Sequence, residues 1–482
     1  LEDENRREDW PETIERFIDF IISERPDIPE KTQSKIRKYM TEFAVMPSMR
    51  FLWAAGPAAK ADNTCIYNCS FAKINSVEAF AECLYVLMCG TGFGFSVENE
   101  EVEKLPTVPE INSALGNPKV IIEDSKAGWA DSVKTLMQSL YDGQNVYFNY
   151  DLIRGEGARL KTMGGRASGP QPLIKLHDFI RETMHNSQGR KLTALEAHDI
   201  CNQIAEIVVV GGVRRSSQIS LSDLDDEEMR HAKDWPYPIK RAMANNSAIY
   251  RAQPSAAEFL KEWASLALSG TGERGIFNLE AAQSKAPSRR YSPKIQGTNP
   301  CGEIMLRDMQ FCNLSEVVVR ADDNLDTLLD KVETATWLGV IQSSFTYFPY
   351  LRNDWKKNCD VEALLGVSLT GQMDNPSVLS SDALAALKSR VIRIARKASG
   401  ILGTKMPAAT TCVKPSGTVS QLVDSASGVH PRYSEYYIRR YRISARDPLF
   451  RMMKDSGIKA SPENGQTEDD ATTYVLEFPV KS

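Results

Sequence analysis

The chain has 482 residues, of which 42% are hydrophobic and 25% charged, a balance typical of globular proteins. Its net charge of −5 argues against a broad basic surface for nucleic acid, so nucleic acid is not expected as a partner. No apolar run approaches the roughly 18–20 residues of a membrane span, and the charged N-terminus lacks a signal-peptide core. These features predict a cytoplasmic protein without a membrane partner.

The first half of the chain alternates predicted helices with loops. Apolar residues spaced as in a helix occupy positions 14–21, and Pro26 ends that pattern. A loop-rich stretch over 46–69 precedes a predicted helix around 77–88. That helix stops at a glycine cluster over 90–94, which lacks the preceding strand and the spacing of a dinucleotide fingerprint. We therefore interpret the cluster as a tight turn.

The second half mixes helices and strands. Ser255 and Glu258 form a capping box for a helix that Gly270 can end. A second helix is predicted over 382–399, with Ser381 as its cap and an apolar face of Leu384, Leu387, Val391 and Ile394. Strand-like runs are Gln218 to Leu221, Val317 to Val319 and Tyr474 to Phe478. Such intermixing favours an α/β architecture.

Nine cysteines are present without any CxxC pair, and only five histidines accompany them. In a cytoplasmic chain this composition favours reduced thiols or redox groups over structural disulfides, and it gives a zinc site weak support. Free cysteines are usually buried as small apolar residues. We expect that role for Cys83, Cys89, Cys201, Cys359 and Cys412.

The segment 297–304 (GTNPCGEI) places Cys301 between an amide, Asn299, and a carboxylate, Glu303. Pro300 and Gly302 disfavour helix and ladder pairing, so we expect a tight loop. All three side chains can then point toward one small ligand, as a radical or nucleophilic site requires. A plain turn with a buried cysteine and a solvated glutamate is the structural alternative.

The segment 414–420 (KPSGTVS) offers consecutive backbone N–H groups and hydroxyls ahead of a possible helix. Such a helix start can bind phosphate, although a plain Pro-Ser-Gly turn has the same sequence. Arg214 and Arg215 could also meet phosphates, but a surface or ion-paired role fits them equally well. Tyr436 and Tyr437 lie in a strand-like run, where structural packing is the better interpretation.

Several motifs occur in an order that resembles ribonucleotide reductases. The segment 299–304 followed by Cys312-Asn313-Leu314 is similar to the family's finger loop. Further counterparts are Asn68-Cys69-Ser70-Phe71, the segments 90–97, 167–173, 213–216, 245–247 and 413–419, and the segment 477–481. The resemblance is nearest to the monomeric, adenosylcobalamin-dependent (class II) ribonucleoside-triphosphate reductases, and it spans roughly residues 45 to 482.

This resemblance implies a ten-stranded α/β barrel of the ribonucleotide reductase and glycyl radical enzyme type with a central finger loop. The barrel would cover 46–482, be truncated at its C-terminus and follow an N-terminal helical region over 1–45. An effector-binding insertion is expected within about 100–200. The chain stops just after a strand-like run, where the family continues, so repeated turnover by this chain alone is in doubt.

The resemblance also implies roles for single residues. Cys301 would carry the thiyl radical that abstracts the ribose 3′-hydrogen, Glu303 would take the 3′-hydroxyl proton, and Asn299 would hold the sugar hydroxyls. Cys69 and Cys312 would form the reducing dithiol, with Cys65 as the rival of Cys69. The substrate phosphates would meet the loop of Pro415, Ser416, Gly417, Thr418 and Val419, with Ser48 as a second candidate.

The implied cofactor is adenosylcobalamin, and no metal ligands are assigned to side chains. The implied partners are a ribonucleoside triphosphate (or diphosphate) substrate, a deoxynucleotide effector and a thioredoxin-like reductant. The alternatives are a reductase of another class, a radical barrel enzyme with a non-nucleotide substrate, and a degenerate paralogue that only binds nucleotides. The intact set of Asn299, Cys301, Glu303, Cys69 and Cys312 argues against degeneration.

Overall fold

The fold was analysed in a computed structural model of the 482-residue chain. The structure describes residues 6–111, 119–158, 167–210, 217–445, 447–463, 466–469, 471 and 473–481. Arg214, Arg215 and the rest of the motif 213–216 lie outside these residues. Among the helices of the described chain, none is long and apolar enough to cross a membrane.

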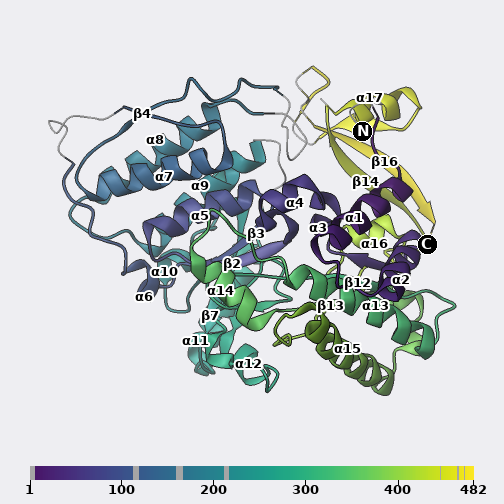
Figure 1. Cartoon of the computed structure of the whole chain (residues 1–482). Helices are drawn as coiled ribbons and strands as arrows, with labels where there is room; N and C mark the ends of the chain where they lie inside the picture. The colour runs from purple at the N-terminus through teal and green to yellow at the C-terminus, as the bar shows by residue number, and fades with distance from the viewer. Residues whose placement is uncertain are drawn as a thin grey trace.

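The largest sheet has six strands in the order β11-β2-β3-β6-β7-β8 (Figure 1). The strands are, in that order, Gln310–Phe311, Cys69–Lys73, Gly92–Ser96, Gln218–Asp223, Ala244–Tyr250 and Gly275–Asn278. β2, β3, β6, β7 and β8 are parallel, and only β11 runs antiparallel to its neighbour. Parallel strands need long crossover connections, and helices provide most of them here.

Helices build a thick layer beside this sheet. α5 (Val77–Met88) contacts β3, and α9 (Ala194–Val210) contacts β6. α7 (Lys126–Tyr141) and α8 (Gln171–Asn186) pack against α5 and α9 as an outer layer, seen at the upper left of Figure 1. The predicted helix 77–88 is thus confirmed. α5 is buried along nearly its whole length because α7 and α9 cover it from two sides.

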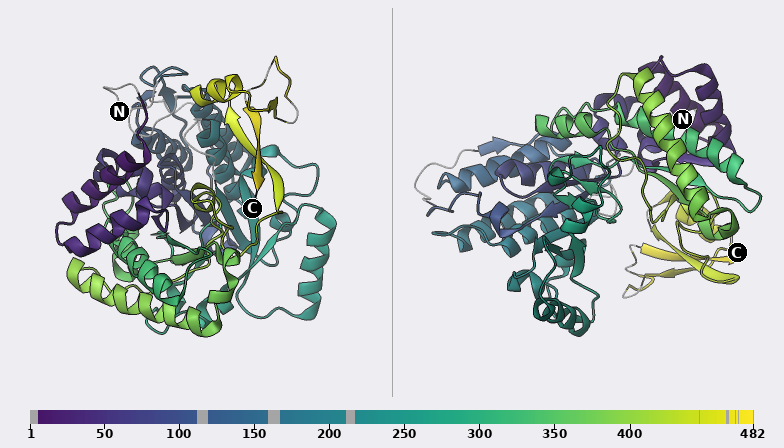
Figure 2. Two further views of the ribbon diagram at one scale, coloured as in Figure 1. Left: turned by 90° about the vertical axis from the view of Figure 1, so that its right-hand side faces the viewer. Right: turned by 90° about the horizontal axis from the view of Figure 1, so that it is seen from below.

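A second sheet has the order β1-β12-β13, formed by Val45–Pro47, Ser315–Val318 and Val367–Thr370. α13 (Leu325–Ser343) packs on β1, β12 and β13, and α15 (Ser381–Leu402) packs on α13. The N-terminal helices α1 (Trp10–Glu24) and α2 (Glu30–Thr41) lie beside them (Figure 2). Their buried residues belong to the hydrophobic core that also includes residues of α13 and α15.

The described residues form an α/β fold but no closed barrel, so the expected ten-stranded barrel, truncated at its C-terminus, is confirmed only as an α/β fold. Five parallel strands lie in the first sheet and two in the second, and no strand hydrogen bonds join the two sheets in the described chain. The expected central finger loop is present. β9 (Gly297–Thr298) and β10 (Met305–Leu306) form a two-stranded hairpin that contacts β2 and β3.

The remaining elements are peripheral or short. β14, β15 and β16 form a C-terminal three-stranded sheet from Tyr436–Ser444, Ala460–Pro462 and Thr473–Lys481, and β4 and β5 pair Lys119–Ile121 with Tyr147–Asn149. The other helices are α3 Met49–Ala54, α4 Pro57–Ala61, α6 Asn99–Val102, α10 Glu227–Arg230, α11 Ala256–Ser269, α12 Leu279–Ser284, α14 Asn353–Glu362, α16 Val419–Leu422 and α17 Pro448–Asp455.

Three local predictions need correction. The glycine cluster is a turn only at Gly90, because residues 92–96 form strand β3 inside the sheet. Helix α15 is capped by Ser380, whose side chain accepts from the Ala383 N–H, and Ser381 is its first residue. Leu384 is 42% exposed, whereas Leu387, Val391 and Ile394 are buried as expected.

Candidate active site

Cys301 lies at the tip of the finger hairpin, in a loop that is stabilised by hydrogen bonds between its own residues. Asn299 is fully buried, and its side-chain oxygen accepts from the Ile304 N–H at 3.0 Å. Its amide nitrogen donates to Glu303 Oε2 at 2.7 Å. Gly302 closes the turn with a φ of +80°, a conformation that favours glycine. The loop therefore fixes Asn299 and Glu303 beside Cys301.

Glycines let the hairpin approach the sheet closely. A β-carbon on Gly94 would lie 2.3 Å from the Thr298 carbonyl oxygen, and one on Gly297 would lie 2.2 Å from the Phe71 ring. At Gly92 a β-carbon would lie 3.2 Å from Cys69 Sγ and 3.3 Å from Pro300 Cγ. β9 thus crosses directly over β2 and β3, and the fingertip reaches the strand end that carries Cys69.

Three thiols converge at this point. Cys69 begins β2, and its carbonyl oxygen accepts from the Cys312 N–H at 2.9 Å, just after β11. The Cys69 thiol lies near enough to the thiols of both Cys301 and Cys312 for each to shift its pKa. Cys69 and Cys312 are buried, whereas Cys301 is exposed. The rival Cys65 instead donates to the Asp62 carbonyl at 3.1 Å, so it is Cys69 whose backbone is bonded to that of Cys312.

Two of these thiols, Cys301 and Cys69, are held in the protonated S–H form. The hydrogen bond to Cys69, followed by burial, raises the pKa of the Cys301 thiol far above its ordinary value. At Cys69 the bond from Cys301 lowers the pKa, but the bond to Cys312 and burial outweigh it, so its pKa is also well above the ordinary value. A nucleophilic cysteine needs a thiolate, whereas a hydrogen-atom donor needs S–H. The raised pKa values of Cys301 and Cys69 are thus those expected of hydrogen-atom donors and not of nucleophiles.

Glu303 lies in a charged corner of the same site. Burial raises its pKa, and the bond from Asn299 and the nearby Lys414 ammonium oppose that rise. Lys414 Nζ donates to Glu316 Oε1 at 2.5 Å, and Glu316 on β12 is fully buried. Burial also raises the pKa of Cys412, which Glu303 raises further. Sequence reasoning missed Glu316, although an acid within the apolar run 315–319 is a recognisable signal.

The chain just before the predicted phosphate loop pairs with β13, through a parallel bridge between Thr411 and Val367. Its Ser416 hydroxyl is buried, donates to Glu316 and accepts from the Ser420 N–H at 3.2 Å. Gly417 and Thr418 are exposed just ahead of α16. Ser48 caps α3 at the Phe51 N–H and donates to the Ile66 carbonyl, both at 3.2 Å. Both serine hydroxyls thus already have protein partners.

The other cysteines lie where small apolar residues are expected, with one exception. Cys83, Cys89, Cys201 and Cys359 are buried, whereas Cys412 is partly exposed and packs against the cluster that contains Cys69 and Cys312. Within the described ranges, no group of three or more His, Cys, Asp and Glu side chains is arranged to hold a metal ion.

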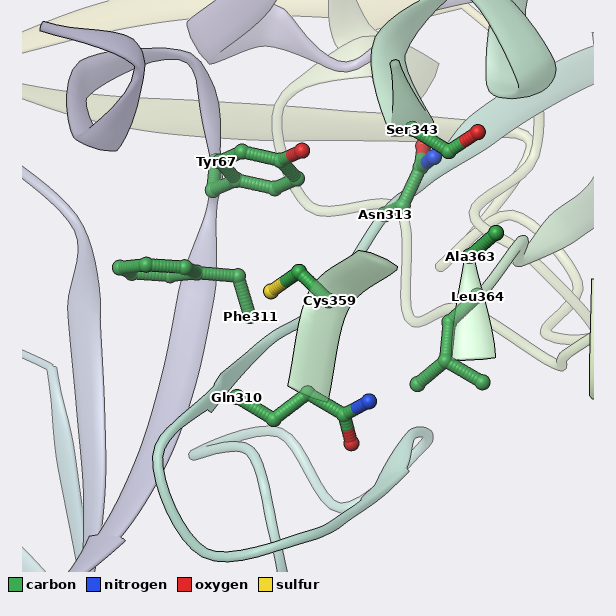
Figure 3. Close-up of a pocket in the computed structure, with 8 residues that line it drawn as sticks. All are labelled: Tyr67, Gln310, Phe311, Asn313, Ser343, Cys359, Ala363 and Leu364. Carbon is green, nitrogen blue, oxygen red and sulfur yellow. The ribbon is translucent and has the colours of Figure 1, made fainter. Parts of the chain in front are cut away.

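A small cavity lies behind the strand that leads to Cys312 (Figure 3). Its volume is about 10 Å³, enough for one water molecule at most. The Asn313 Oδ1 atom at its wall is buried and has no hydrogen-bond partner among the described residues. This cavity is therefore no nucleotide site. It is lined by Tyr67, Gln310, Phe311, Asn313, Ser343, Cys359, Ala363 and Leu364.

Comparison with known proteins points to ribonucleotide reductases. A family model described as the ribonucleotide reductase barrel domain matches residues 213–337. Adenosylcobalamin-dependent ribonucleoside-triphosphate reductases of Lactobacillus gasseri, Levilactobacillus brevis and Lactobacillus leichmannii are 26%, 27% and 25% identical to the chain. Each alignment covers 100% of this chain and 77–78% of the relative.

Solved structures agree at the level of the fold. A B12-dependent (class II) ribonucleotide reductase superposes with a TM-score of 0.82 at 24% identity, covering 100% of this chain and 80% of that one. The class Id ribonucleotide reductase alpha subunit of Actinobacillus ureae superposes with a TM-score of 0.56 at 12% identity, covering 92% of this chain and 75% of that one. With the finger loop and its three thiols in place, these matches show that the chain has the ribonucleotide reductase fold and is similar along its whole length to adenosylcobalamin-dependent ribonucleoside-triphosphate reductases.

Proposed function

We propose that this chain is an adenosylcobalamin-dependent ribonucleotide reductase that acts on ribonucleoside triphosphates. The convergence of Cys301, Cys69 and Cys312 beside Glu303 and Asn299 is the observation that carries the proposal. The curated relatives named for this activity align with the whole chain, which supports the choice of cofactor and of triphosphates.

The exposure of the fingertip fits an external radical source. The residue Cys301 is exposed, whereas the two cysteines behind it are buried, so a bound group can approach the fingertip without disturbing the pair. When bound, adenosylcobalamin supplies a radical by homolysis of its cobalt–carbon bond, which protein side chains cannot provide unaided. Cys301 is the residue that we expect to face it.

The chain's own residues then divide the work on the ribose. Cys301, as a thiyl radical, takes the hydrogen atom from C3′ and later returns one. Glu303 accepts the 3′-hydroxyl proton, and Asn299 orients both Glu303 and the sugar hydroxyls. Cys69 and Cys312 give up two electrons and two protons as they close a disulfide, while the 2′-hydroxyl leaves as water. The products balance as one deoxynucleotide, one water and one disulfide.

The substrate phosphates are proposed to bind at the loop 415–419. Because the Ser416 hydroxyl is already bonded to Glu316, the exposed backbone at Gly417 and Thr418 is the better candidate for phosphate contact. Ser48 remains a weaker proposal, since its hydroxyl caps α3. The disulfide must be re-reduced, which requires a dithiol reductant such as a thioredoxin. A deoxynucleotide effector within 100–200 is likewise a proposal.

Single-turnover assays test the proposal. The chain is incubated anaerobically with adenosylcobalamin and a ribonucleoside triphosphate, and deoxynucleotide is quantified against the diphosphate and against hydroxocobalamin. We expect product only with adenosylcobalamin, and more from the triphosphate. Cys301→Ser should lower the rate by at least about 1,000-fold while nucleotide affinity changes less than about twofold, since it removes chemistry and not binding. Full activity in Cys301→Ser would overturn the assignment.

A further inference from the structure

A buried carboxylate lies at the base of the finger hairpin, away from the reacting groups. Glu362 is the last residue of α14 and is fully buried. Cations from both flanks of the hairpin meet it, Arg290 before β9 and Arg307 after β10. Neither Glu362 nor these arginines belong to the motifs that identify the family's chemistry.

Arg290 ties Glu362 to the hairpin directly. Its Nε donates to Glu362 Oε1 at 2.9 Å and its Nη2 donates to Oε2 at 2.7 Å, a two-pronged pair. The same Nη2 also donates to the Met305 carbonyl on β10 at 2.9 Å. Arg307 Nε lies 3.0 Å from Glu362 Oε1 as an ion pair. Planar guanidinium forks of this kind fix geometry as well as charge.

Glu362 also holds β11, the strand that leads to Cys312. Gln310 on β11 donates from Nε2 to Glu362 Oε2 at 3.0 Å and to the Asn358 carbonyl on α14 at 3.2 Å. Its Oε1 accepts from the Arg307 N–H at 2.8 Å. Cys312 follows two residues later, bonded through its backbone to Cys69. The Glu362 carboxylate thus connects both flanks of the finger hairpin to the strand that leads to Cys312.

The charge on Glu362 is maintained inside the fold. Burial raises its pKa, but the bonds from Arg290 and Gln310 and the charge of Arg307 outweigh burial and lower the pKa below its ordinary value. The site therefore holds one carboxylate against two guanidinium groups. A neutral side chain at 362 would leave two cations facing each other in the interior, which would push the hairpin flanks apart.

We infer that Glu362 is a positioning residue that fixes the finger loop, and with it Cys301, in register with the Cys69–Cys312 pair. The inference rests on the proposed function for its catalytic consequence, but the position of the thiol can be measured without turnover. A displacement of about 1 Å at a reacting group can lower a rate by about 100-fold.

The experiment compares Glu362→Gln, Glu362→Asp and a matched control, Glu82→Gln. Glu82 on α5 is also buried and also binds an arginine fork, since Arg352 donates to it from Nε at 3.0 Å and Nη2 at 2.7 Å. That pair lies at the N-terminal end of α14, whereas Glu362 lies at the C-terminal end. Each variant is assayed for melting temperature, nucleotide affinity, single-turnover rate and the rate of Cys301 alkylation by iodoacetamide.

For Glu362→Gln we expect a single-turnover rate lowered by about 100-fold, nucleotide affinity within about threefold, and a Cys301 alkylation rate changed severalfold. Glu362→Asp keeps the charge and should recover part of both rates. Glu82→Gln should lower the melting temperature to a similar extent and leave Cys301 alkylation as in the parent chain.

Two results would overturn the inference. One is an unchanged Cys301 alkylation rate in Glu362→Gln, and the other is an equal change in Glu82→Gln, which would mark a general loss of stability. If the parent chain formed no deoxynucleotide, the proposed function would fail, while the alkylation rates would still decide the role of Glu362.

Discussion

At the scale of single residues, the site depends on proton positions set by burial and by neighbouring charge. Glu303 can act as a base only when ionised, and burial raises its pKa while Lys414 opposes that rise. On acidification, a carboxylate with a raised pKa is protonated at a higher pH than a free glutamate. The activity should therefore begin to fall at a higher pH. The pH at which the rate falls on the acidic side should therefore depend on the charge of Lys414.

Replacing Lys414 by Met removes the cation and should shift the acidic limb of the single-turnover rate to higher pH. Lys414→Arg keeps a cation and should shift it less. Lys397→Met, on the exposed surface of α15, serves as the control for a lost surface charge. The measurement is the rate at a series of pH values with saturating nucleotide. An acidic limb at the same pH in Lys414→Met would show that Lys414 does not influence Glu303.

Residues could be predicted from the sequence where a motif is contiguous. Asn299, Cys301 and Glu303 fall within five positions, and the structure brings them together in one turn. Glu316 and Glu362 could not be assigned in this way, because their partners lie 98 to 100 and 52 to 72 positions away, respectively. Their roles emerge only from the packing of β12 and α14 against other segments.

At the scale of elements, the finger hairpin packs closely on the six-stranded sheet because its backbone approaches the backbone of β3 where it crosses the sheet. The strand β3 carries Gly94 directly beneath the Thr298 carbonyl. The pattern of glycines was predicted to be a turn, and only Gly90 is one. Sequence periodicity cannot distinguish a glycine needed for a turn from a glycine needed for close approach, since both depend on what lies opposite.

Gly94→Ala should displace the hairpin, because the added carbon would overlap a backbone oxygen that no side-chain rotation can move. We expect a loss of about 1–3 kcal/mol in the free energy of unfolding, measured in urea, and a large loss of single-turnover rate. Gly400→Ala is the control, since a β-carbon there meets nothing within 4 Å inside α15. That change should add up to about 1 kcal/mol of stability. Equal effects of the two changes would contradict the proposed clearance.

At the scale of the whole molecule, the site is assembled between two sheets. Cys69 begins β2 and Cys312 follows β11 of the six-stranded sheet, which the finger hairpin contacts. Glu316, Cys412 and Lys414 are placed by β12 and β13 of the other sheet. The α/β class and the helices α1, α5, α11 and α15 could be predicted from hydrophobic periodicity and capping residues, whereas α7, α8, α9 and α13 were not predicted. The absence of a closed barrel among the described strands could not, because strand order depends on contacts between distant segments.

Mapping the disulfide after one turnover tests the central claim most directly. The parent chain is reduced, freed of reductant, allowed one anaerobic turnover with adenosylcobalamin and a ribonucleoside triphosphate, then alkylated and analysed by mass spectrometry. We predict one disulfide between Cys69 and Cys312 for each deoxynucleotide formed, with Cys301 recovered as an alkylated thiol. Deoxynucleotide formed while Cys69 and Cys312 both remain thiols, or a disulfide that includes Cys301, would contradict the account.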